Sequence, residues 1–330
     1  MTRTTPAVPL TKAGPKVGMV ITALVVVYIV WGSTYLGIRI VVEEAPPLIT
    51  MGLRFTTAAL VLGSILVWRG GLRRLAIGPR ELLGAAFLGL MLPMLGNGLV
   101  SVGENMGAPS GVTALLIATA PLWIIVFRAV EGDRPRPLTM FGVLLGFLGL
   151  AFLVLVGRGG GDLDLAPALV ILFASSCWAI GSYAQPRLRL PRDVFVVAVY
   201  EMLTGGLIMI SIGLISGEQF TGDYSARTWI ALAYLVLFGS VLAFTSYVWL
   251  LTNVRISLVA TYAYVNPVVA VFLGWLILNE AITVPIVIGG GIVVLAVGIV
   301  ITAERPRKHR QDTPVPGDGR TASEHETSSS

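Results

Sequence analysis

The sequence predicts an all-α integral membrane protein with ten transmembrane helices, arranged as a 5+5 inverted repeat. Three observations support this fold class. First, hydrophobic residues make up 55% of the 330 residues and charged residues only 12%, about half the charged fraction of a soluble domain. Second, the charges avoid ten long stretches. Third, a residue pattern in the first half of the chain recurs in the second half.

Each of the ten stretches can cross the roughly 30 Å apolar core of a bilayer as a helix of about twenty residues. Eight contain no Asp, Glu, Lys or Arg: 17–38, 82–103, 105–127, 137–157, 165–186, 228–254, 256–279 and 281–303. Two, 45–68 and 194–217, carry one charge each. The first stretch is too long for the apolar region of a cleaved signal peptide and lacks small cleavage-site residues, so we expect it to remain as helix 1.

The positive charges predict the orientation. Of 23 Lys and Arg residues, 19 lie in the tails and loops of one side, three lie on the other side, and one is within a helix. Positive loops stay in the cytoplasm, so both termini are expected to be cytoplasmic. An even number of helices independently requires both termini on one side.

The second half of the chain repeats the first half at a spacing of 147 residues. Trp31 recurs as Trp178, and Glu201 occupies the position equivalent to Arg54. Internal repetition indicates duplication. Five helices per half is an odd number, so the second half enters from the opposite face. Inverted repeats of this kind are typical of transporters that bind solute near the middle of the membrane, between the halves.

The chain divides into four segments. Residues 1–16 form a cytoplasmic tail, and 304–330 form a second, disordered one, because both are too polar and too rich in Pro, Ser, Thr and Gly to pack. Residues 17–157 form the first repeat, helices 1–5, and 165–303 form the second, helices 6–10.

Arg54 and Glu201 are the two charges within predicted spans. A charge there costs about 2.5–3.5 kcal/mol on insertion scales, so each should face the interior and have a partner. One interpretation is a structural ion pair that joins the two halves. The other is functional: the two residues contact substrate, or Glu201 carries a proton.

Aromatic and small polar residues follow one another in helix 1, and the pattern partly recurs in helix 6. Trp and Tyr within a span, away from the interfaces, favour a cavity in which their polar atoms find partners. Close helix packing is the alternative explanation of the small residues. The residues expected to line the cavity are Trp31, Ser33, Thr34, Tyr35, Arg54, Asn97, Trp178, Ser182, Glu201, Tyr262 and Asn266.

Three predicted helices contain breaking residues. Pro93, followed by Gly96-Asn97-Gly98, is expected to interrupt helix 3; Pro121 interrupts helix 4, and Asn266-Pro267 interrupts helix 9. Proline removes one backbone hydrogen bond, and the freed carbonyl needs protein or a watery cavity around it. The three prolines are therefore expected near a gate or binding region.

Glycines in helices 5 and 10 (Gly142, Gly146, Gly149, Gly289, Gly290, Gly291 and Gly298) indicate helix-packing surfaces. A homodimer contact is the alternative use of these surfaces. Asp133 and Glu280 lie at equivalent helix ends and are expected to form caps or loop ion pairs.

Other function classes lack their residues. His309 and His325 are both in the tail, and no Walker motif or pair of intramembrane carboxylates is present. We therefore expect no catalytic residues, no metal and no cofactor. The net charge of +5 is a topology signal, and no nucleic-acid partner is expected.

Several segments together resemble the EamA-type transporters of the drug/metabolite transporter superfamily. These are WGSTYLGIR at 31–39, PPL and GLRF within 46–55, GNG at 96–98 and TYAYVNPVVAV at 261–271. The resemblance covers about residues 18–302. It implies export or exchange of small metabolites, often amino acids, and a central cavity lined mainly by helices 1, 3, 4, 6, 8 and 9. Asp133-Arg134-Pro135 departs from the family's Glu-Arg-Pro.

We therefore expect a secondary active transporter in the bacterial cytoplasmic membrane. It would move a small polar metabolite outward by alternating access, with the lipid bilayer around it and with proton or ion coupling. The alternative is a non-transporting polytopic membrane protein, such as a lipid-handling or sensory subunit, which predicts a dry, packed region between the halves. A channel is less favoured, because no charged ring or filter sequence is present.

Overall fold

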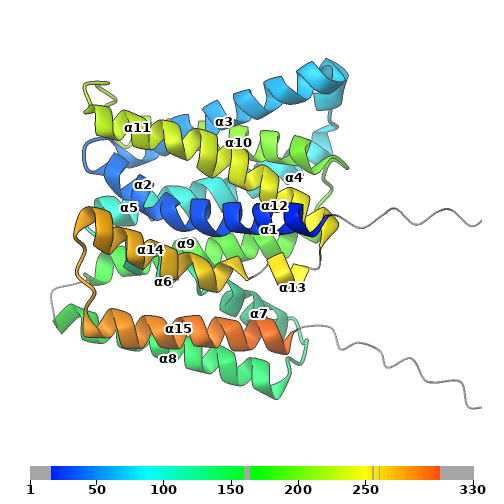
Figure 1. The fold of residues 1–330 in the computed structure, drawn as a ribbon. Coiled ribbons are helices and arrows are strands. Elements are labelled where there is room, and N and C mark those ends of the chain that lie inside the picture. The colour runs from blue at the N-terminus through cyan, green and yellow to red at the C-terminus, as the bar shows by residue number, and fades with distance from the viewer. Residues whose placement is uncertain (1–15, 160–163, 255, 260, 305–330) are drawn as a thin grey trace, which may run out of the picture.

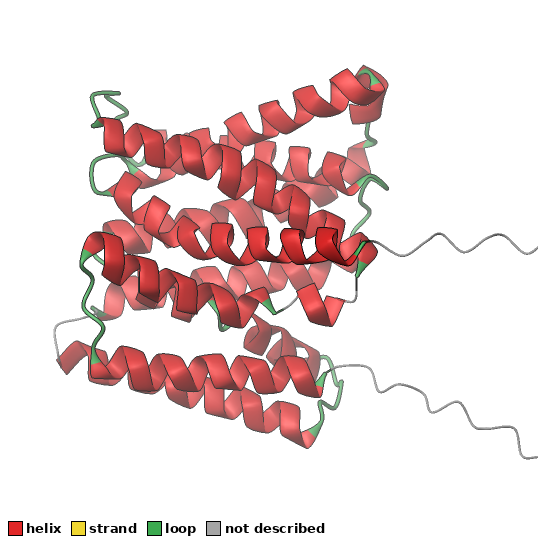
Figure 2. Ribbon diagram, viewed as in Figure 1, coloured by secondary structure: helices red, strands yellow, loops and turns green. Residues whose placement is uncertain are grey.

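The described residues of the computed structural model, 16–159, 164–254, 256–259 and 261–304, contain helices and no strands (Figure 2). Both predicted tails therefore fall almost wholly outside the described residues. Within these ranges nine helices are long and apolar enough to cross a membrane. The tenth predicted span appears as a shorter apolar helix, Tyr262–Leu278, of 17 residues.

The first half of the chain contains eleven elements. They are α1 (Val17–Val26), η1 (Val27–Trp31), α2 (Gly32–Val42), α3 (Pro47–Gly70), η2 (Leu72–Leu75), α4 (Pro79–Gly89), η3 (Leu90–Gly98), α5 (Leu99–Asn105), α6 (Ser110–Ile117), α7 (Ala120–Val130) and α8 (Pro137–Gly159).

The second half contains nine elements. They are α9 (Leu165–Ala184), η4 (Gln185–Arg187), α10 (Val194–Ile215), α11 (Ala226–Tyr234), η5 (Leu235–Leu242), α12 (Ala243–Asn253), α13 (Ile256–Val259), α14 (Tyr262–Leu278) and α15 (Val284–Ala303).

The helices run side by side in one bundle (Figure 1). Helices α8 and α15 pack together at one flank, α3 packs along α10 at the other, and α1, α2, α5, α6, α9 and α14 lie between. The start of α1 and the end of α15 lie at the same end of the bundle. We call this the inner end. The opposite end, which carries the α2–α3, α5–α6 and α14–α15 turns, is the outer end.

Glycines allow the backbones of paired helices to approach closely. A Cβ atom on Gly52 of α3 would lie 2.8 Å from the carbonyl oxygen of Gly206 on α10, and one on Gly149 would lie 3.2 Å from that of Gly289. These contacts confirm part of the predicted packing surface. Gly291 and Gly298 have no atom within 4 Å of an added Cβ, so those two glycines do not pack within the described chain.

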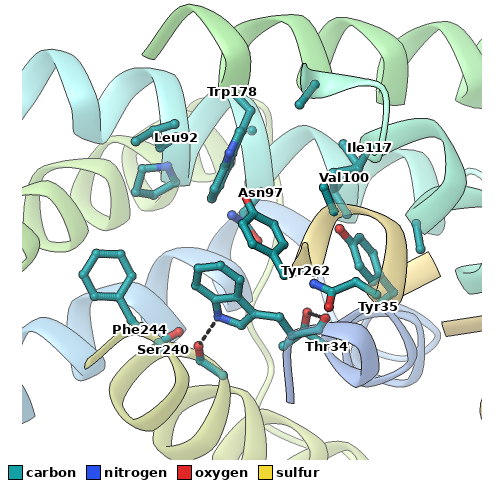
Figure 3. A pocket seen from close by; sticks show the side chains of 18 of the residues that line it. Thr34, Tyr35, Leu92, Asn97, Val100, Ile117, Trp178, Ser240, Phe244 and Tyr262 are labelled. Atoms are coloured by element: carbon teal, nitrogen blue, oxygen red, sulfur yellow. Dashed lines mark hydrogen bonds between the residues drawn. The ribbon is translucent and has the colours of Figure 1, made fainter. Parts of the chain in front are cut away.

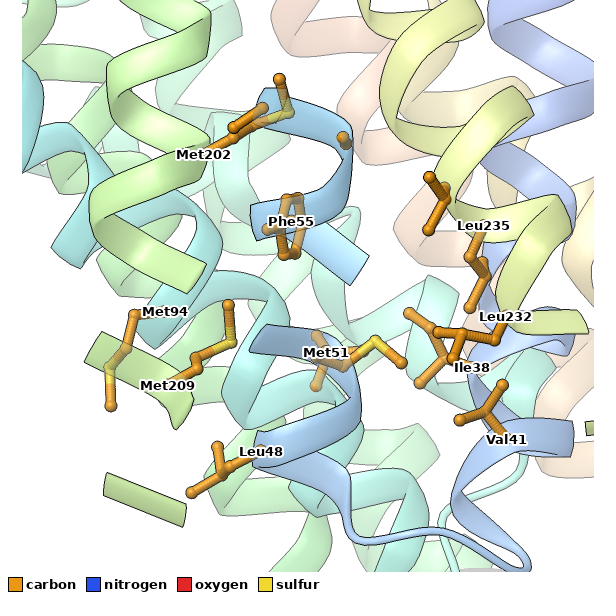
Figure 4. Packing of buried hydrophobic residues seen from close by; sticks show 14 of the residues in the cluster. Ile38, Val41, Leu48, Met51, Phe55, Met94, Met202, Met209, Leu232 and Leu235 are labelled. Carbon is orange, nitrogen blue, oxygen red and sulfur yellow. The ribbon is translucent and has the colours of Figure 1, made fainter. Parts of the chain in front are cut away.

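A methionine-rich apolar core stabilises the flank formed by α3 and α10. Met51, Met94 and Met209 are buried between these helices and η3, beside Phe55 (Figure 4). Flexible thioether side chains fill irregular gaps in a core. The methionine side chains therefore fill the space beside η3, whose backbone departs from regular α-helical geometry.

Three carboxylates at the outer end bind the first backbone N–H groups of neighbouring helices. Glu218 accepts from Leu48 and Ile49 N–H of α3, at 3.1 and 2.8 Å. Glu44 accepts from Ser225 N–H and the Thr228 hydroxyl of α11, both at 2.8 Å. These hydrogen bonds hold the pKa of Glu44 below its ordinary value.

The third carboxylate is that of Glu280. It accepts from Ser110 N–H at 2.8 Å, the Ser110 hydroxyl at 3.0 Å and Gly111 N–H at 3.2 Å. The first N–H groups of a helix have no partner within it and attract negative charge. At the inner end, Arg128 pairs with Asp133 at 2.5 Å. The expected cap and loop ion pair are both confirmed.

Candidate functional site

A cavity of about 120 Å³ lies in the middle of the bundle. Its volume is roughly four times the 30 Å³ that a water molecule occupies in the liquid. Asn97, Trp178, Ser240 and Tyr262 approach it from η3, α9, η5 and α14, respectively (Figure 3). The cavity thus has room for a few waters or one small solute.

Most of the predicted site residues meet at this cavity. Nine line it: Trp31, Thr34, Tyr35, Arg54, Asn97, Trp178, Glu201, Tyr262 and Asn266. The three prolines, Pro93, Pro121 and Pro267, also line it. Helices α3 and α10 also contribute to the cavity wall, through Arg54 and Glu201. The family resemblance did not imply a contribution from these two helices.

Ser33 and Ser182 are not part of the cavity wall, contrary to the prediction. The Ser33 hydroxyl lies 2.6 Å from that of Tyr234 and donates to the Val30 carbonyl at 2.9 Å. The Ser182 hydroxyl donates to the Trp178 carbonyl at 2.8 Å. Ser33 turns toward a neighbouring helix because adjacent residues on a helix point about 100° apart. Ser182 lies on nearly the same face as Trp178 but one turn, about 6 Å, further along α9, so it misses the cavity by its position along the helix.

Trp31, the last residue of η1, contacts residues of η5, α12 and α14 beside the cavity. Its indole N–H donates to the Gly239 carbonyl of η5 at 3.1 Å. Its ring centroid lies 4.9 Å from that of Tyr247 and 5.3 Å from that of Tyr262, the latter edge to face. Aromatic pairs at these distances add stability beyond the area that they bury. Trp31 thus fixes one side of the cavity.

Arg54 presents a buried guanidinium to the cavity. Its side chain extends from α3, is 4% exposed, and donates from Nε to the Ser240 hydroxyl at 3.0 Å. The guanidinium carbon lies 4.7 Å from the centre of the Phe55 ring. Among the described residues no carboxylate lies within 4.0 Å of it. Its positive charge is therefore not paired with a carboxylate of any described residue.

Glu201 presents the opposite charge. It lies on α10, two turns after the Asp193 side chain caps that helix by accepting from Phe195 N–H at 3.0 Å. It is 6% exposed, and within the described chain its carboxylate has neither a hydrogen bond nor an ion pair. The ion pair with Arg54 that the sequence suggested does not form, although both residues line the same cavity.

The helix breaks agree only in part with the prediction. Helix 3 widens into the π-helical segment η3 around Pro93, and helix 4 breaks between α6 and α7, just before Pro121. Pro267, in contrast, lies inside a continuous α14. The interruption of helix 9 predicted at Asn266-Pro267 is therefore wrong, because the chain winds on through the proline from Tyr262.

The buried amide of Asn266 lies where helix 1 approaches α14. With its nitrogen turned toward them, it donates to the Tyr28 and Tyr262 carbonyls, both at 3.2 Å. This side chain therefore supplies donors to backbone carbonyls beside the cavity, which explains a polar residue next to Pro267 without a helix break.

Two features of the site were missed in the sequence. The π-helical segments η1 and η5 widen helices 1 and 8 at the cavity, and Ser240 of η5 binds Arg54. Each segment contains or precedes a Gly-Ser pair, Gly32-Ser33 or Gly239-Ser240. Gly-Ser pairs are a known cause of helix distortion, so these two pairs could have indicated the distorted segments from the sequence.

Comparisons with known proteins agree with this architecture. The model of the EamA-like transporter family matches twice, at residues 18–155 and 165–302. The uncharacterized inner membrane transporter YedA of Escherichia coli K12 is 40% identical over 281 residues, 84% of this chain and 89% of that protein. The uncharacterized transporter YoaV of Bacillus subtilis is 23% identical over 82% of this chain and 92% of that protein.

A solved structure, described only as the crystal structure of a protein, has the same fold with a TM-score of 0.59. It is 20% identical and covers 87% of this chain and 98% of its own. The family model matches most of the chain, as two copies, and the 40% identical relative covers the same region. This chain therefore belongs to the EamA-like transporter family, a family of transporters rather than of enzymes.

Proposed function

We propose that this protein is a secondary active transporter that exports a small zwitterionic metabolite, such as an amino acid, from the cytoplasm by alternating access. One observation carries the proposal: two groups of opposite charge, Arg54 and Glu201, line one small cavity, and neither forms an ion pair with a described residue. A zwitterion supplies both missing partners at once. The cavity volume of about 120 Å³ favours a small solute.

The proposed chemistry follows from the side chains. The Arg54 guanidinium can hold a carboxylate with two parallel hydrogen bonds, and Ser240 orients it from the side. Glu201 would accept hydrogen bonds from an ammonium group, or carry a proton when no solute is bound. The aromatic rings of Trp31, Trp178 and Tyr262 would cover the apolar part of the solute.

The proposed architecture is ten crossings in a 5+5 inverted repeat. The two matches of the family model, each spanning five crossings, support repeats at 17–157 and 165–303. The short helix α13 and the 17-residue α14 would together form the ninth crossing. We assign the inner end to the cytoplasm of a bacterial cell, from the distribution of arginines and from the name of the E. coli relative.

Flux measurements in proteoliposomes test the site. We expect counterflow of a labelled amino acid in the wild type. Arg54→Ala should lower it by roughly 30- to 700-fold, which corresponds to the loss of about 2–4 kcal/mol of charged contact. Glu201→Gln should lower it by a similar factor. Ser182→Ala is the matched control, because Ser182 lies on the same helix as Trp178 but outside the cavity wall.

Analogues separate the two roles. Arg54→Ala should spare a solute that keeps the amine but lacks the carboxylate, and Glu201→Gln should spare the reverse analogue. Equal losses for both analogues in both variants would contradict the assignment of one charge to each group. A non-transporting lipid-handling or sensory protein remains the alternative, and a wild type that moves no solute in this assay would favour it.

A further inference from the structure

Glu104 is the most unusual ionisable residue of the described chain. It lies on α5, one residue before the end of that helix, and is 0% exposed. Neither of its carboxyl oxygens has a hydrogen-bond partner. Every buried carboxyl group is expected to be bonded or paired. Since Glu104 is neither, its burial needs another explanation.

The charged neighbours of Glu104 are occupied elsewhere. Arg39 of α2 donates to the backbone carbonyl of Glu104, not to its carboxyl group, and also lies 3.8 Å from Glu43. Glu280, in the turn after α14, lies within electrostatic range but is committed to the first N–H groups of α6. The hydroxyl of Thr113 on α6 lies near the Glu104 carboxyl group, but it donates to the Pro109 carbonyl at 3.0 Å and makes no hydrogen bond of normal geometry to Glu104.

The remaining elements that pack against α5 offer no further charge to this carboxyl group. Helix α9 and segment η3 contain no charged residue. Helix α3 carries a buried charge at Arg54, but this side chain binds Ser240. Tyr35 of α2 faces Glu104 within electrostatic range and also lines the cavity. The carboxyl group therefore lies buried between Tyr35 of the cavity wall and the α5–α6 turn at the outer end.

Burial of an ionised carboxylate without a partner is very costly, whereas a protonated carboxyl is neutral and far less so. We propose that Glu104 is a proton-binding site of the transport cycle, occupied while the outer end is closed around it. This proposal rests on the proposed transport function and adds the coupling ion to it.

The step is a simple proton transfer. While the outer end is closed and the cavity faces the cytoplasm, the O–H bond of the Glu104 carboxylic acid breaks, the proton passes to water in the cavity beside Tyr35 and so to the cytoplasmic side, and the outer end can open. The guanidinium of Arg39 then moves from the Glu104 carbonyl to the new carboxylate, which it can hold as an ion pair. Closure of the outer end requires a proton from the outer solution to bind Glu104, which frees Arg39. One proton is thereby taken from outside and released to the cytoplasmic side in each cycle, opposite in direction to the exported solute.

Labelling of the outer end tests the proposal independently of any solute. The native cysteine, Cys177, is replaced by serine, and Ala108→Cys, a buried position of the α5–α6 turn, reports opening in lipid nanodiscs by its reaction with a maleimide. Met106→Cys, 43% exposed in the same turn, gives the intrinsic pH dependence of the reaction. The ratio of the two rates measures opening.

We expect the ratio to rise about tenfold between pH 5 and pH 9. In Glu104→Gln, which imitates the protonated group, it should stay at the low value throughout. Arg39→Gln, which removes the cation that holds the open form, should move the rise to higher pH. An unchanged pH profile in Glu104→Gln, or no rise in the wild-type background, would overturn the proposal. Thermal melting of each variant shows whether it is folded.

A flux assay separates this proposal from the proposed function. If the wild type moves no solute, the proposed transport function is wrong. The labelling result alone then decides whether protonation of Glu104 controls opening of the outer end. If solute moves, and a pH gradient drives its flux equally in the wild type and Glu104→Gln, transport stands and Glu104 is not the coupling site. We expect the pH gradient to stimulate wild-type flux at least fivefold and the variant less than twofold.

Discussion

The acidic residues of the outer turns and those of the buried interior meet opposite conditions. Glu280 accepts three hydrogen bonds and Glu218 two, all but one from backbone N–H groups at the start of a helix. Glu201 and Glu104 are more deeply buried, yet the described chain gives their carboxyl groups no partner. The protein thus satisfies its carboxylates where they join helices and leaves them unsatisfied in and beside the cavity.

This difference separates stability from function. A carboxylate that caps a helix lowers the free energy of the folded state, because it replaces water around N–H groups that have no partner within the helix. A buried carboxyl group without a partner raises that free energy unless a proton, cation or solute completes it. Substitutions in the two groups should therefore have opposite consequences.

The largest effect on stability is expected for Glu280→Gln. The amide nitrogen of glutamine would face N–H donors, so the cap loses charged hydrogen bonds worth about 1.5–3 kcal/mol each at most, and we expect a total loss of about 2–3 kcal/mol. Tryptophan fluorescence during thermal unfolding in detergent would measure it. Glu218→Gln, with two bonds instead of three, should lose less. An unchanged melting temperature in Glu280→Gln would show that the bonds of Glu280 to the start of α6 do not stabilise the fold.

A second prediction concerns the α3–α10 contact that supports Arg54 and Glu201. Gly206→Ala places a Cβ 2.4 Å from the Thr56 hydroxyl and 2.8 Å from the Gly52 carbonyl. Such overpacking costs about 1–3 kcal/mol. Gly291→Ala is the matched control, since an added Cβ there meets no atom within 4 Å. Equal stability of the two variants would mean that α3 and α10 do not approach as closely as described.

Glu201 provides the opposite case to Glu280. Glu201→Gln removes a buried charge that has no partner in the described chain, so the melting temperature should stay the same or rise, by the equivalent of about 0–1 kcal/mol. The same purified variant should be defective in flux. A loss of stability as large as that of Glu280→Gln would indicate that Glu201 has a structural partner after all.

The smallest effect is expected at the inner end, at Glu304. Burial raises the pKa of this carboxyl group, but hydrogen bonds from Arg128 at 2.6 Å and Thr139 at 2.7 Å outweigh it and hold the pKa below its ordinary value of 4.5. A lowered folded-state pKa means that the ionised form stabilises the fold. This contribution is complete above pH 4.5 and is lost as pH falls through the lower, folded-state pKa.

We therefore expect less than about 1 kcal/mol of acid-dependent stability from Glu304. Melting curves of wild type and Glu304→Gln between pH 3 and pH 6 would measure it, and the two should converge at the acid end. A gap that widens as the pH falls would have the wrong sign for this assignment.

Much of the fold could be predicted from the sequence because lipid imposes a simple rule on each segment. A span must be about 20 residues long and nearly free of charge, and the duplication could be recognised from residue spacing alone. The same constraint made Arg54 and Glu201 stand out, since each is a single charge in an apolar stretch. Their common location at one cavity agrees with that expectation.

What the sequence could not provide was the rotation of each helix about its axis and the identity of neighbours far along the chain. Ser33 differs from its cavity-lining neighbours Thr34 and Tyr35 only by rotation, and Gly291 differs from Gly289 in the same way. Ser182 differs from Trp178 by one turn along α9. Glu104 lies at the junction of two apolar stretches, where a charge appears ordinary. Only the packing of α2, α6 and α9 around α5 encloses it, because burial depends on every helix that surrounds a residue, not on its own segment.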